Sequence, residues 1–362
     1  MDKVMIFLPS LGGGGAEKNA AVLANFLSKR YIVEIVCCYK KEKTKSSAEL
    51  NEKVRLRFLG KERAISALYD IYKIIKVERP KAVITTVAYF SLLFSVLIPF
   101  LPKSINYLCR ETNIPEVYGA QKGVIYKWVS NLIYRYFYKN YNTVICQSDD
   151  MLFSIKSATK LSDSSLVKIN NPALISSNRC DDLLPFSDNI SARAGEYLIA
   201  AGRLTYQKGF DLLLEEYNTS TLKNYGIKLL IAGVGPDESI LKSRVRELEL
   251  EEYIHFLGYR KDIEALISHA RGFVLSSRFE GFPNVVLEAL ILGCPVLARD
   301  CPGGIRELIH DEVNGVLYEH DFADAIIRFM DIKFDKSSIS NDVSNRFNLT
   351  KLFSKYYELI EQ

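Results

Sequence analysis

The sequence has little of what marks secreted or membrane-spanning proteins. Its seven cysteines are odd in number and scattered, and no Cys-x-x-Cys pair occurs, so neither a disulfide framework nor a zinc site is indicated. The longest apolar run, residues 88–101, is about six residues shorter than a membrane-spanning helix. The opening apolar run leads straight into glycines and does not resemble a signal peptide. We therefore predict a cytoplasmic protein with reduced thiols, soluble or peripheral to a membrane.

Histidine is also scarce, and the net charge is small. The chain has four histidines, all in its second half, so we expect no catalytic base of the histidine type. They are His255, His269, His310 and His320. A net charge of +4 does not by itself indicate nucleic acid, and we predict none as a partner. The charge is uneven, because residues 1–170 hold 26 basic and 14 acidic side chains and the rest hold 21 and 29. The basic first half predicts contact with an anionic surface or ligand.

The apolar pattern predicts two α/β domains. With 362 residues, 48% of them apolar, the chain is long enough for two packed cores. Buried-strand and helix patterns alternate twice, which is typical of parallel, doubly wound Rossmann-like sheets with helices on both faces. A polar stretch over residues 170–197 predicts the linker. We expect an amino-terminal domain over 1–175, completed by a carboxyl-terminal helix at 345–362, and a second domain over 190–340. Two such domains are expected to face a ligand-binding cleft at their strand ends.

A glycine-rich loop, LGGGGAEK, lies between the first predicted strand and its helix. Gly14 and Gly15 let the backbone approach a ligand, and a helix amino terminus suits a phosphate group. The register excludes G-x-G-x-x-G, because Glu17 or Lys18 stands where the last glycine belongs. No Gly-Lys-Ser/Thr follows either, so neither a dinucleotide fingerprint nor a P-loop is present. The alternative is a tight strand-to-helix turn with no ligand.

The loop after the strand pattern EYLIAAGRL carries two cations. Arg203 and Lys208 lie five positions apart, and Gly209 follows directly. An arginine can bind two phosphate oxygens at once, and a lysine adds a second charge, so together they can neutralise a diphosphate. The alternative is an ordinary solvated basic loop.

Two glutamates lie eight positions apart in SSRFEGFPNVVLE. Glu280 precedes a predicted helix, and Glu288 lies about one turn inside it. Carboxylates accept hydrogen bonds from vicinal hydroxyls, so one can hold a sugar and the other a ribose. The alternative is that Glu280 caps the helix and Glu288 is a surface residue. Against it, Glu288 interrupts an apolar helix, where a charge needs a partner.

Two further strand-end loops are candidates for the edge of a nucleotide base. They contain Gly233, in AGVGP, and Arg260, in GYR. Taken alone, both are also ordinary α/β loops.

Together these motifs resemble the retaining glycosyltransferases of family 4, which have the GT-B fold. The family's E-x7-E pair matches Glu280 and Glu288, its GR…KG pair matches Arg203 and Lys208, and its GGAE loop begins at Gly14. The resemblance implies that Arg203 and Lys208 hold the donor diphosphate, that Glu288 binds the ribose and that Glu280 contacts the sugar. It implies a nucleotide sugar, often of uridine diphosphate (UDP), and no cofactor or obligatory metal. The loop beside the donor would comprise Gly281, Phe282, Pro283 and Asn284, although Pro283 has no N–H to give.

This chain departs from the family at one position in the first domain. Many members have a histidine directly after the strand that corresponds to INYLCRE in this chain. Here residues 109–113 read CRETN, without a histidine. We expect Arg110 and Thr112 to take that place, and Glu17 to lie on the same acceptor or donor-sugar side. The identity of the sugar is therefore left open.

The resemblance also implies a reaction and a setting. We expect Arg203, Lys208 and Glu280 to be the catalytic residues. The enzyme would transfer a hexose or N-acetylhexosamine to a lipid-linked glycan acceptor. The expected setting is the assembly of bacterial surface polysaccharide, lipopolysaccharide O-antigen or capsule. Residues 118–141 form a helical pattern rich in aromatic and basic side chains, which suits the inner face of an anionic membrane. An ordinary helix packed on the sheet is the alternative. Other possible functions are an epimerase, an inverting transferase, a dinucleotide-dependent oxidoreductase and a non-catalytic scaffold.

Overall fold

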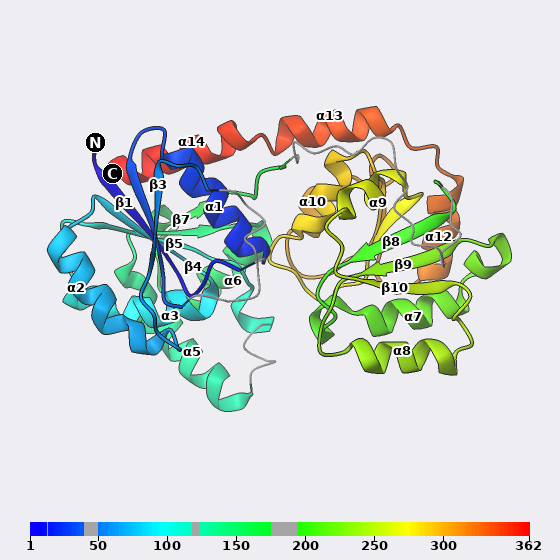
Figure 1. The fold of residues 1–362 in the computed structure, drawn as a ribbon, viewed down its shortest axis with the longest axis horizontal. Coiled ribbons are helices and arrows are strands. Elements are labelled where there is room, and N and C mark those ends of the chain that lie inside the picture. The colour runs from blue at the N-terminus through cyan, green and yellow to red at the C-terminus, as the bar shows by residue number, and fades with distance from the viewer. Residues whose placement is uncertain (13, 40–49, 118–122, 175–193) are drawn as a thin grey trace. The chain divides into compact units, whose positions relative to one another are not determined.

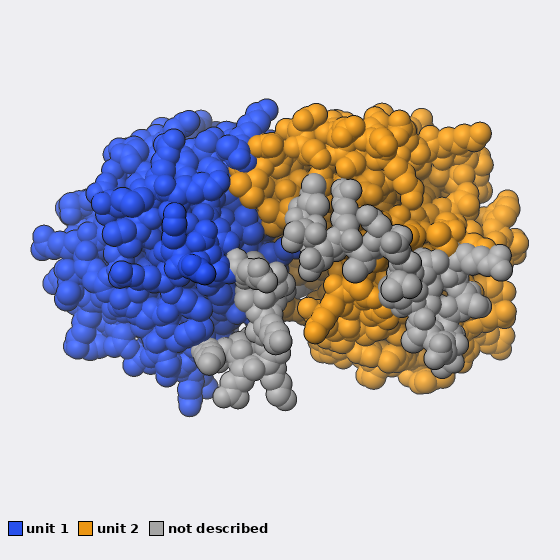
Figure 2. Space-filling model, turned by 45° about the horizontal axis from the view of Figure 1, so that its top comes forward, with its two compact units in different colours: residues 1–171, 350–362 blue, residues 172–349 orange. Residues whose placement is uncertain are grey.

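The computed structural model describes residues 1–12, 14–39, 50–117, 123–174 and 194–362. Gly13, Cys180 and the greater part of the expected linker lie outside the described residues, as do the first five residues of the segment 118–141. The chain divides into two compact units (Figure 2). Unit 1 comprises Met1–Asn171 and Thr350–Gln362, and unit 2 comprises Pro172–Leu349.

Unit 1 is built on a parallel sheet of seven strands in the order β3-β2-β1-β4-β5-β6-β7. The chain begins at β1, moves outward through β2 and β3, and returns beside β1 at β4, so the winding direction reverses between β1 and β4. The central strands are buried on both faces, as expected of a sheet covered by helices. The strands are β1 (Lys3–Leu8), β2 (Ile32–Cys37), β3 (Val54–Phe58), β4 (Ala82–Thr86), β5 (Asn106–Arg110), β6 (Thr143–Cys146) and β7 (Leu166–Lys168).

Helices cover both faces of this sheet (Figure 1). On one face, α1 (Gly15–Leu27) lies beside the last helix, α14 (Leu349–Glu361), where the Tyr357 ring stacks on Phe26 at 5.0 Å between centroids. On the other face, Met5 and Phe7 of β1 contribute to a core shared with four helices. Those helices are α2 (Leu68–Glu78), α3 (Ala88–Leu97), α5 (Val124–Phe137) and α6 (Asp149–Ala158). The short 3₁₀ segments are η1 (Ile65–Ala67), η2 (Ile98–Phe100), η3 (Tyr138–Asn140) and η4 (Asp163–Ser165).

Unit 2 repeats this plan with six parallel strands in the order β10-β9-β8-β11-β12-β13, so its winding reverses between β8 and β11. The strands are β8 (Tyr197–Ala201), β9 (Lys228–Ala232), β10 (Ile254–Gly258), β11 (Gly272–Leu275), β12 (Val296–Arg299) and β13 (Gly315–Tyr318). Helices α7 (Phe210–Thr219), α8 (Glu238–Glu247) and α12 (Phe322–Asp331) share a core with one face. Helices α9 (Ile263–His269), α10 (Asn284–Ile291) and α13 (Lys336–Arg346) cover the other (Figure 1). The remaining elements are η5 (Tyr206–Lys208), η6 (Thr221–Tyr225) and α11 (Ile305–Leu308).

The prediction of two doubly wound α/β units is therefore confirmed. The six cysteines in the described part of the chain are buried and form no disulfide. Burial raises the pKa of Cys37 to about 12, so its thiol stays protonated near neutral pH.

Candidate active site

The predicted donor-binding loops meet at the point where the winding of unit 2 reverses. One loop follows β8 and the other follows β11, at the carboxyl ends of neighbouring parallel strands, where open α/β sheets bind ligands. Two hydrogen bonds join the loops. The Gln207 side-chain amide donates to the carbonyl of Phe279 at 3.2 Å, and the backbone N–H of Arg278 donates to the carbonyl of Gln207 at 2.8 Å. The fold thus brings together two motifs that lie some seventy residues apart in sequence.

Lys208 and Glu280 form an ion pair at this point. The Lys208 Nζ lies 2.6 Å from Oε1 of Glu280, and the Ser277 hydroxyl donates to the same oxygen at 2.6 Å. The Glu280 side chain is only 7% exposed and that of Lys208 is 20% exposed, so the buried carboxylate is compensated by one charged and one neutral donor. An ammonium group has three N–H donors. Lys208 can therefore hold Glu280 and still bind an oxygen of a ligand.

A glycine allows the two loops to come this close. Gly209 has a φ of +63°, and a Cβ placed on it would lie 2.1 Å from the carbonyl oxygen of Ser276. The Ser276 hydroxyl donates to the carbonyl of Lys208 at 3.0 Å. Only a residue without a side chain combines this backbone conformation with this contact. The glycine after Lys208 thus fixes the lysine against the end of β11.

The other predicted cation of this loop, Arg203, is exposed. Its guanidinium makes no hydrogen bond or ion pair with any residue that the structure describes, so its donors are open to a ligand. Arg278, which the sequence did not single out, is occupied instead. It lies over the Tyr206 ring at 4.0 Å and forms a bidentate pair with Asp211 at 2.6 and 2.7 Å. These hydrogen bonds hold the pKa of Asp211 below its usual value.

The loop after β9 packs directly on the loop after β8. Gly233 has a φ of +140°, and a Cβ there would lie 1.8 Å from the carbonyl oxygen of Gly202, so glycine is again required. Arg260, the other candidate for the base, forms a bidentate pair with Asp262, at 2.7 Å from Nε and 2.5 Å from Nη2. That pair raises the pKa of Arg260. The contact of Arg260 with a base therefore stays a prediction.

Helix α10 starts directly after the second loop. Pro283 is its N-cap residue, so the alternative in which Glu280 caps this helix is wrong. Glu288 is half-buried on the helix. Phe282 is 5% exposed and contacts the Phe347 ring at 5.8 Å between centroids. Gly281 and Phe282 lie in the loop before α10, Pro283 is the N-cap, and Asn284 is the first residue of the helix.

In unit 1, the predicted glycine loop has a capping role. The Glu17 carboxylate accepts hydrogen bonds from the backbone N–H of Gly14 and from the Ser10 hydroxyl, both at 3.0 Å. An acid at this position stabilises the first turn of α1 through its unpaired N–H groups and its dipole. Gly15 is exposed. The contacts of Gly14, Gly15 and Glu17 with a ligand stay predictions.

The strand-end segment that lacks the family's histidine is largely buried within unit 1. Arg110 is 2% exposed and donates to the side chain of Asn171. The Thr112 hydroxyl accepts from the backbone N–H of Ala88, the first residue of α3, at 3.3 Å. Arg110, which was expected to take the place of the missing histidine, thus lies inside the unit and does not reach solvent. Its role and that of Thr112 toward a sugar stay predictions.

Sequence reasoning missed Glu111, which lies next to Arg110. Glu111 is fully buried and accepts a hydrogen bond from the Tyr138 hydroxyl, and the Cys109 thiol lies 3.6 Å away. Burial raises the pKa of Glu111 to about 7, even though these donors lower it. An acid directly after an apolar strand was the signal available in the sequence.

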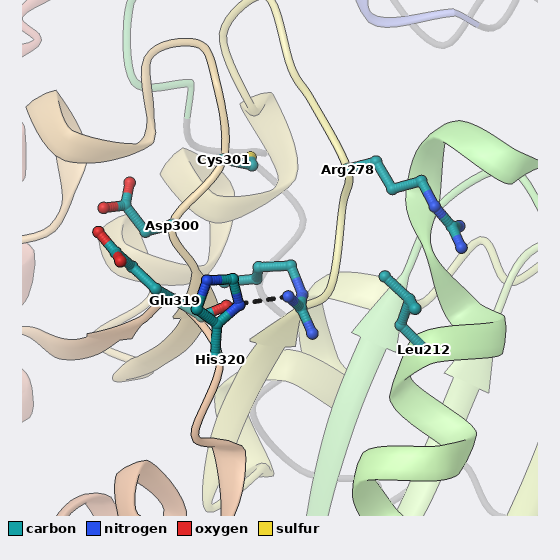
Figure 3. Close-up of a pocket in the computed structure, with 7 residues that line it drawn as sticks. Leu212, Arg278, Asp300, Cys301, Glu319 and His320 are labelled. Atoms are coloured by element: carbon teal, nitrogen blue, oxygen red, sulfur yellow. Dashed lines mark hydrogen bonds between the residues drawn. The ribbon is translucent and has the colours of Figure 1, made fainter.

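A separate cavity of about 290 Å³ lies at the ends of β12 and β13 (Figure 3). None of the predicted donor residues lines it. Its charged groups are largely paired, since Asp300 binds Arg306 at 2.6 Å and Arg299 forms an ion pair with Glu216. The lining residues are Leu212, Arg278, Arg299, Asp300, Cys301, Glu319 and His320.

Comparisons with known proteins agree with this architecture. An uncharacterized glycosyltransferase of Methanocaldococcus jannaschii is 30% identical over 73% of this chain and 66% of its own length, so the match leaves about a third of that protein uncovered. A Campylobacter jejuni protein is 26% identical over 96% of this chain and 94% of its own. It is named N-acetylgalactosamine-N,N'-diacetylbacillosaminyl-diphospho-undecaprenol 4-alpha-N-acetylgalactosaminyltransferase. The crystal structure of Anabaena HepE in complex with UDP-glucose has a TM-score of 0.77, with 16% identity and full coverage of both chains.

The two units have the fold of the GT-B glycosyltransferases, and the sequence relatives are named as glycosyltransferases. Residues 187–344 match the family described as "Glycosyl transferases group 1", and the chain belongs to this family of enzymes. None of the helices in the described part of the chain combines the length and the apolar character that crossing a bilayer requires.

Proposed function

We propose that the enzyme transfers a hexose or N-acetylhexosamine from a UDP-sugar to a lipid-linked glycan, retaining the anomeric configuration. The observation that carries the proposal is the Lys208–Glu280 pair at the winding reversal of unit 2, beside the exposed Arg203. A lysine paired with a carboxylate, with an exposed arginine on the same loop, suits a substrate that joins a diphosphate to a sugar. The UDP-glucose bound to Anabaena HepE and the diphospho-undecaprenol acceptor in the name of the Campylobacter relative support the choice of donor and acceptor.

In this proposal, unit 2 binds the donor. Arg203 and Lys208 bind the diphosphate, Glu288 the ribose hydroxyls, and Glu280 the sugar through the carboxylate oxygen that Lys208 and Ser277 leave open. Gly233 and Arg260 lie beside the nucleotide base of the donor. The loop from Gly281 to Asn284 borders the sugar. The glycine loop of unit 1 contributes its backbone at Gly15 toward the phosphates, whereas the Gly14 N–H is already donated to Glu17.

The chemistry needs little more than charge stabilisation. The bond between the anomeric carbon and the β-phosphate oxygen breaks, and the acceptor hydroxyl forms its bond on the same face of the sugar. The departing diphosphate oxygen takes the hydroxyl proton. Negative charge therefore grows on the diphosphate, where Arg203 and Lys208 stabilise it in the transition state. This route uses no histidine, no cofactor and no obligatory metal.

The acceptor binds to unit 1 in this proposal, with Glu17 and Thr112 on its side. Arg110 is buried, where it donates to Asn171, and does not itself reach the acceptor. A polyprenyl-diphosphate anchor keeps the acceptor at a membrane, so the enzyme works at the inner face of the cytoplasmic membrane. We place this reaction in the assembly of surface polysaccharide, O-antigen or capsule. The excess of basic side chains in residues 1–170 favours contact with an anionic bilayer.

The test is a transfer assay with defined donors. Purified protein is incubated with a panel of UDP-hexoses and UDP-N-acetylhexosamines and a water-soluble, short-chain polyprenyl-diphosphate-linked sugar. We expect release of UDP and a product whose new bond has the anomeric configuration of the donor, read from the proton coupling constant at the anomeric carbon. A product of inverted configuration would contradict the retaining mechanism. The absence of transfer from every donor would contradict the substrate assignment.

A further inference from the structure

Helix α5 is apolar on two sides. One side is built into unit 1, where Ser130 and Tyr134 are buried and α5 packs against α3. On another side, Val124, Ile125 and Trp128 are 85%, 81% and 65% exposed. A helix that only covers a sheet has one apolar stripe and a polar outer side. The outer apolar residues of α5 therefore need another explanation.

These exposed residues form one continuous surface. Val124 and Trp128 are four residues apart, and Leu132 and Tyr136 continue the same spacing, which places them on one side of a helix. Trp128 is the single tryptophan of the chain. The remaining members are Ile125 and Val129. We call the six the α5 strip: Val124, Ile125, Trp128, Val129, Leu132 and Tyr136.

Basic side chains accompany the α5 strip, and α5 has no acidic residue. Lys127, Arg135 and Lys139 are exposed beside it. None of the three forms an ion pair with an acidic residue in the part of the chain that the structure describes. Lys160, just beyond α6, adds a fourth charge, because its ammonium lies 5.6 Å from the centre of the Tyr136 ring. The strip is therefore an apolar surface surrounded by positive charge.

We propose that the α5 strip docks the enzyme on an anionic phospholipid bilayer. Tryptophan and tyrosine favour the boundary between headgroups and acyl chains, aliphatic side chains enter it, and lysine and arginine bind anionic headgroups. A second copy of the chain fits less well, since a two-fold contact through the strip would bring the same cations of both copies together. The inference rests on the proposed function in one respect: a lipid-linked acceptor is held at a membrane, so the enzyme must reach that membrane.

The position of Trp128 supplies a direct readout. Its fluorescence is expected to shift to shorter wavelength on vesicles of phosphatidylglycerol and phosphatidylethanolamine, with little change on phosphatidylcholine alone. Added salt should weaken this binding. In a flotation assay, the affinity of the double variant Ile125→Ser/Trp128→Ser for the anionic vesicles should be at least roughly tenfold lower, because the variant removes two inserted side chains.

Helix α2 offers a matched control. Tyr69 and Val77 are 64% and 83% exposed, close to Trp128 and Ile125. The variant Tyr69→Ser/Val77→Ser should keep both the fluorescence shift and vesicle flotation. Transfer to the water-soluble acceptor should be unchanged in both variants, since neither pair touches the donor-binding loops.

Several results would overturn the docking surface. They are no fluorescence shift with anionic vesicles, equal loss of flotation in both variants, or a wild-type dimer that the α5 variant abolishes. The last would show that the strip binds another copy of the chain. If the wild-type protein binds anionic vesicles through Trp128 but transfers no sugar to the soluble acceptor, the docking surface stands and the proposed function fails.

Discussion

Replacement of Lys208 by alanine is expected to lower turnover by roughly 10²–10³-fold, the usual cost of removing one group that stabilises charge in a transition state. The lysine is fixed by Glu280 at 2.6 Å and by the hydrogen bond from Ser276 to its carbonyl. It therefore needs little reorganisation as the diphosphate leaves. The change should appear in kcat measured with saturating UDP-sugar.

Two observations keep this test specific. Glu280 retains its hydrogen bond from Ser277 in the Lys208→Ala variant, so its buried carboxylate is not left without a donor, and the melting curve should remain cooperative. Lys242 is a matched control, because it also forms an ion pair, with Glu238 at 2.7 Å, but on the exposed surface of α8. Lys242→Ala should leave kcat unchanged. An unaltered kcat in Lys208→Ala would remove the lysine from the mechanism.

Gly209→Ala is expected to lower the free energy of unfolding by roughly 2–5 kcal/mol, the sum of left-handed backbone strain and overpacking. The new Cβ would lie 2.1 Å from the Ser276 carbonyl oxygen, and the backbone φ is +63°. Either Gly209 moves away from β11, or the contact between the two loops opens.

Gly226 separates the two contributions. It has the same φ of +63°, but nothing lies within 4 Å of a Cβ placed on it. Gly226→Ala should therefore cost only the backbone strain, about 1–2 kcal/mol. Denaturant unfolding of both variants measures the difference. Equal losses of stability would mean that the close approach of the two loops is not tightly constrained.

The sequence predicted the architecture well where strands are fully buried. Strands such as β1 and β8 are continuous apolar runs, because helices cover both of their faces. Strand β3, VRLRF, was not expected, since it pairs only with β2, at the edge of the sheet, and is largely exposed. Strand β7 has only three residues, too few to show the apolar pattern by which a strand is recognised in a sequence.

The candidate site was predictable in its residue types and not in its contacts. The positions of Lys208 and Glu280 follow from strand-end loops, a regularity of parallel sheets. Their ion pair depends on the two loops meeting in space, which spacing along the chain does not show. The same holds for Arg110, whose burial follows from its packing next to Asn171. For α5, the sequence pattern could not distinguish a helix packed on the sheet from a helix that contacts a membrane, because a helix with two apolar sides can do both.

The central claim is that the two loops of unit 2 bind the diphosphate of the donor. The most direct test is a crystal structure of the protein with UDP. We predict diphosphate oxygens within hydrogen-bonding distance of the Arg203 guanidinium and the Lys208 ammonium, and ribose hydroxyls on the Glu288 carboxylate. A nucleotide bound in the cavity beside His320, or against the glycine loop of unit 1 alone, would contradict the account.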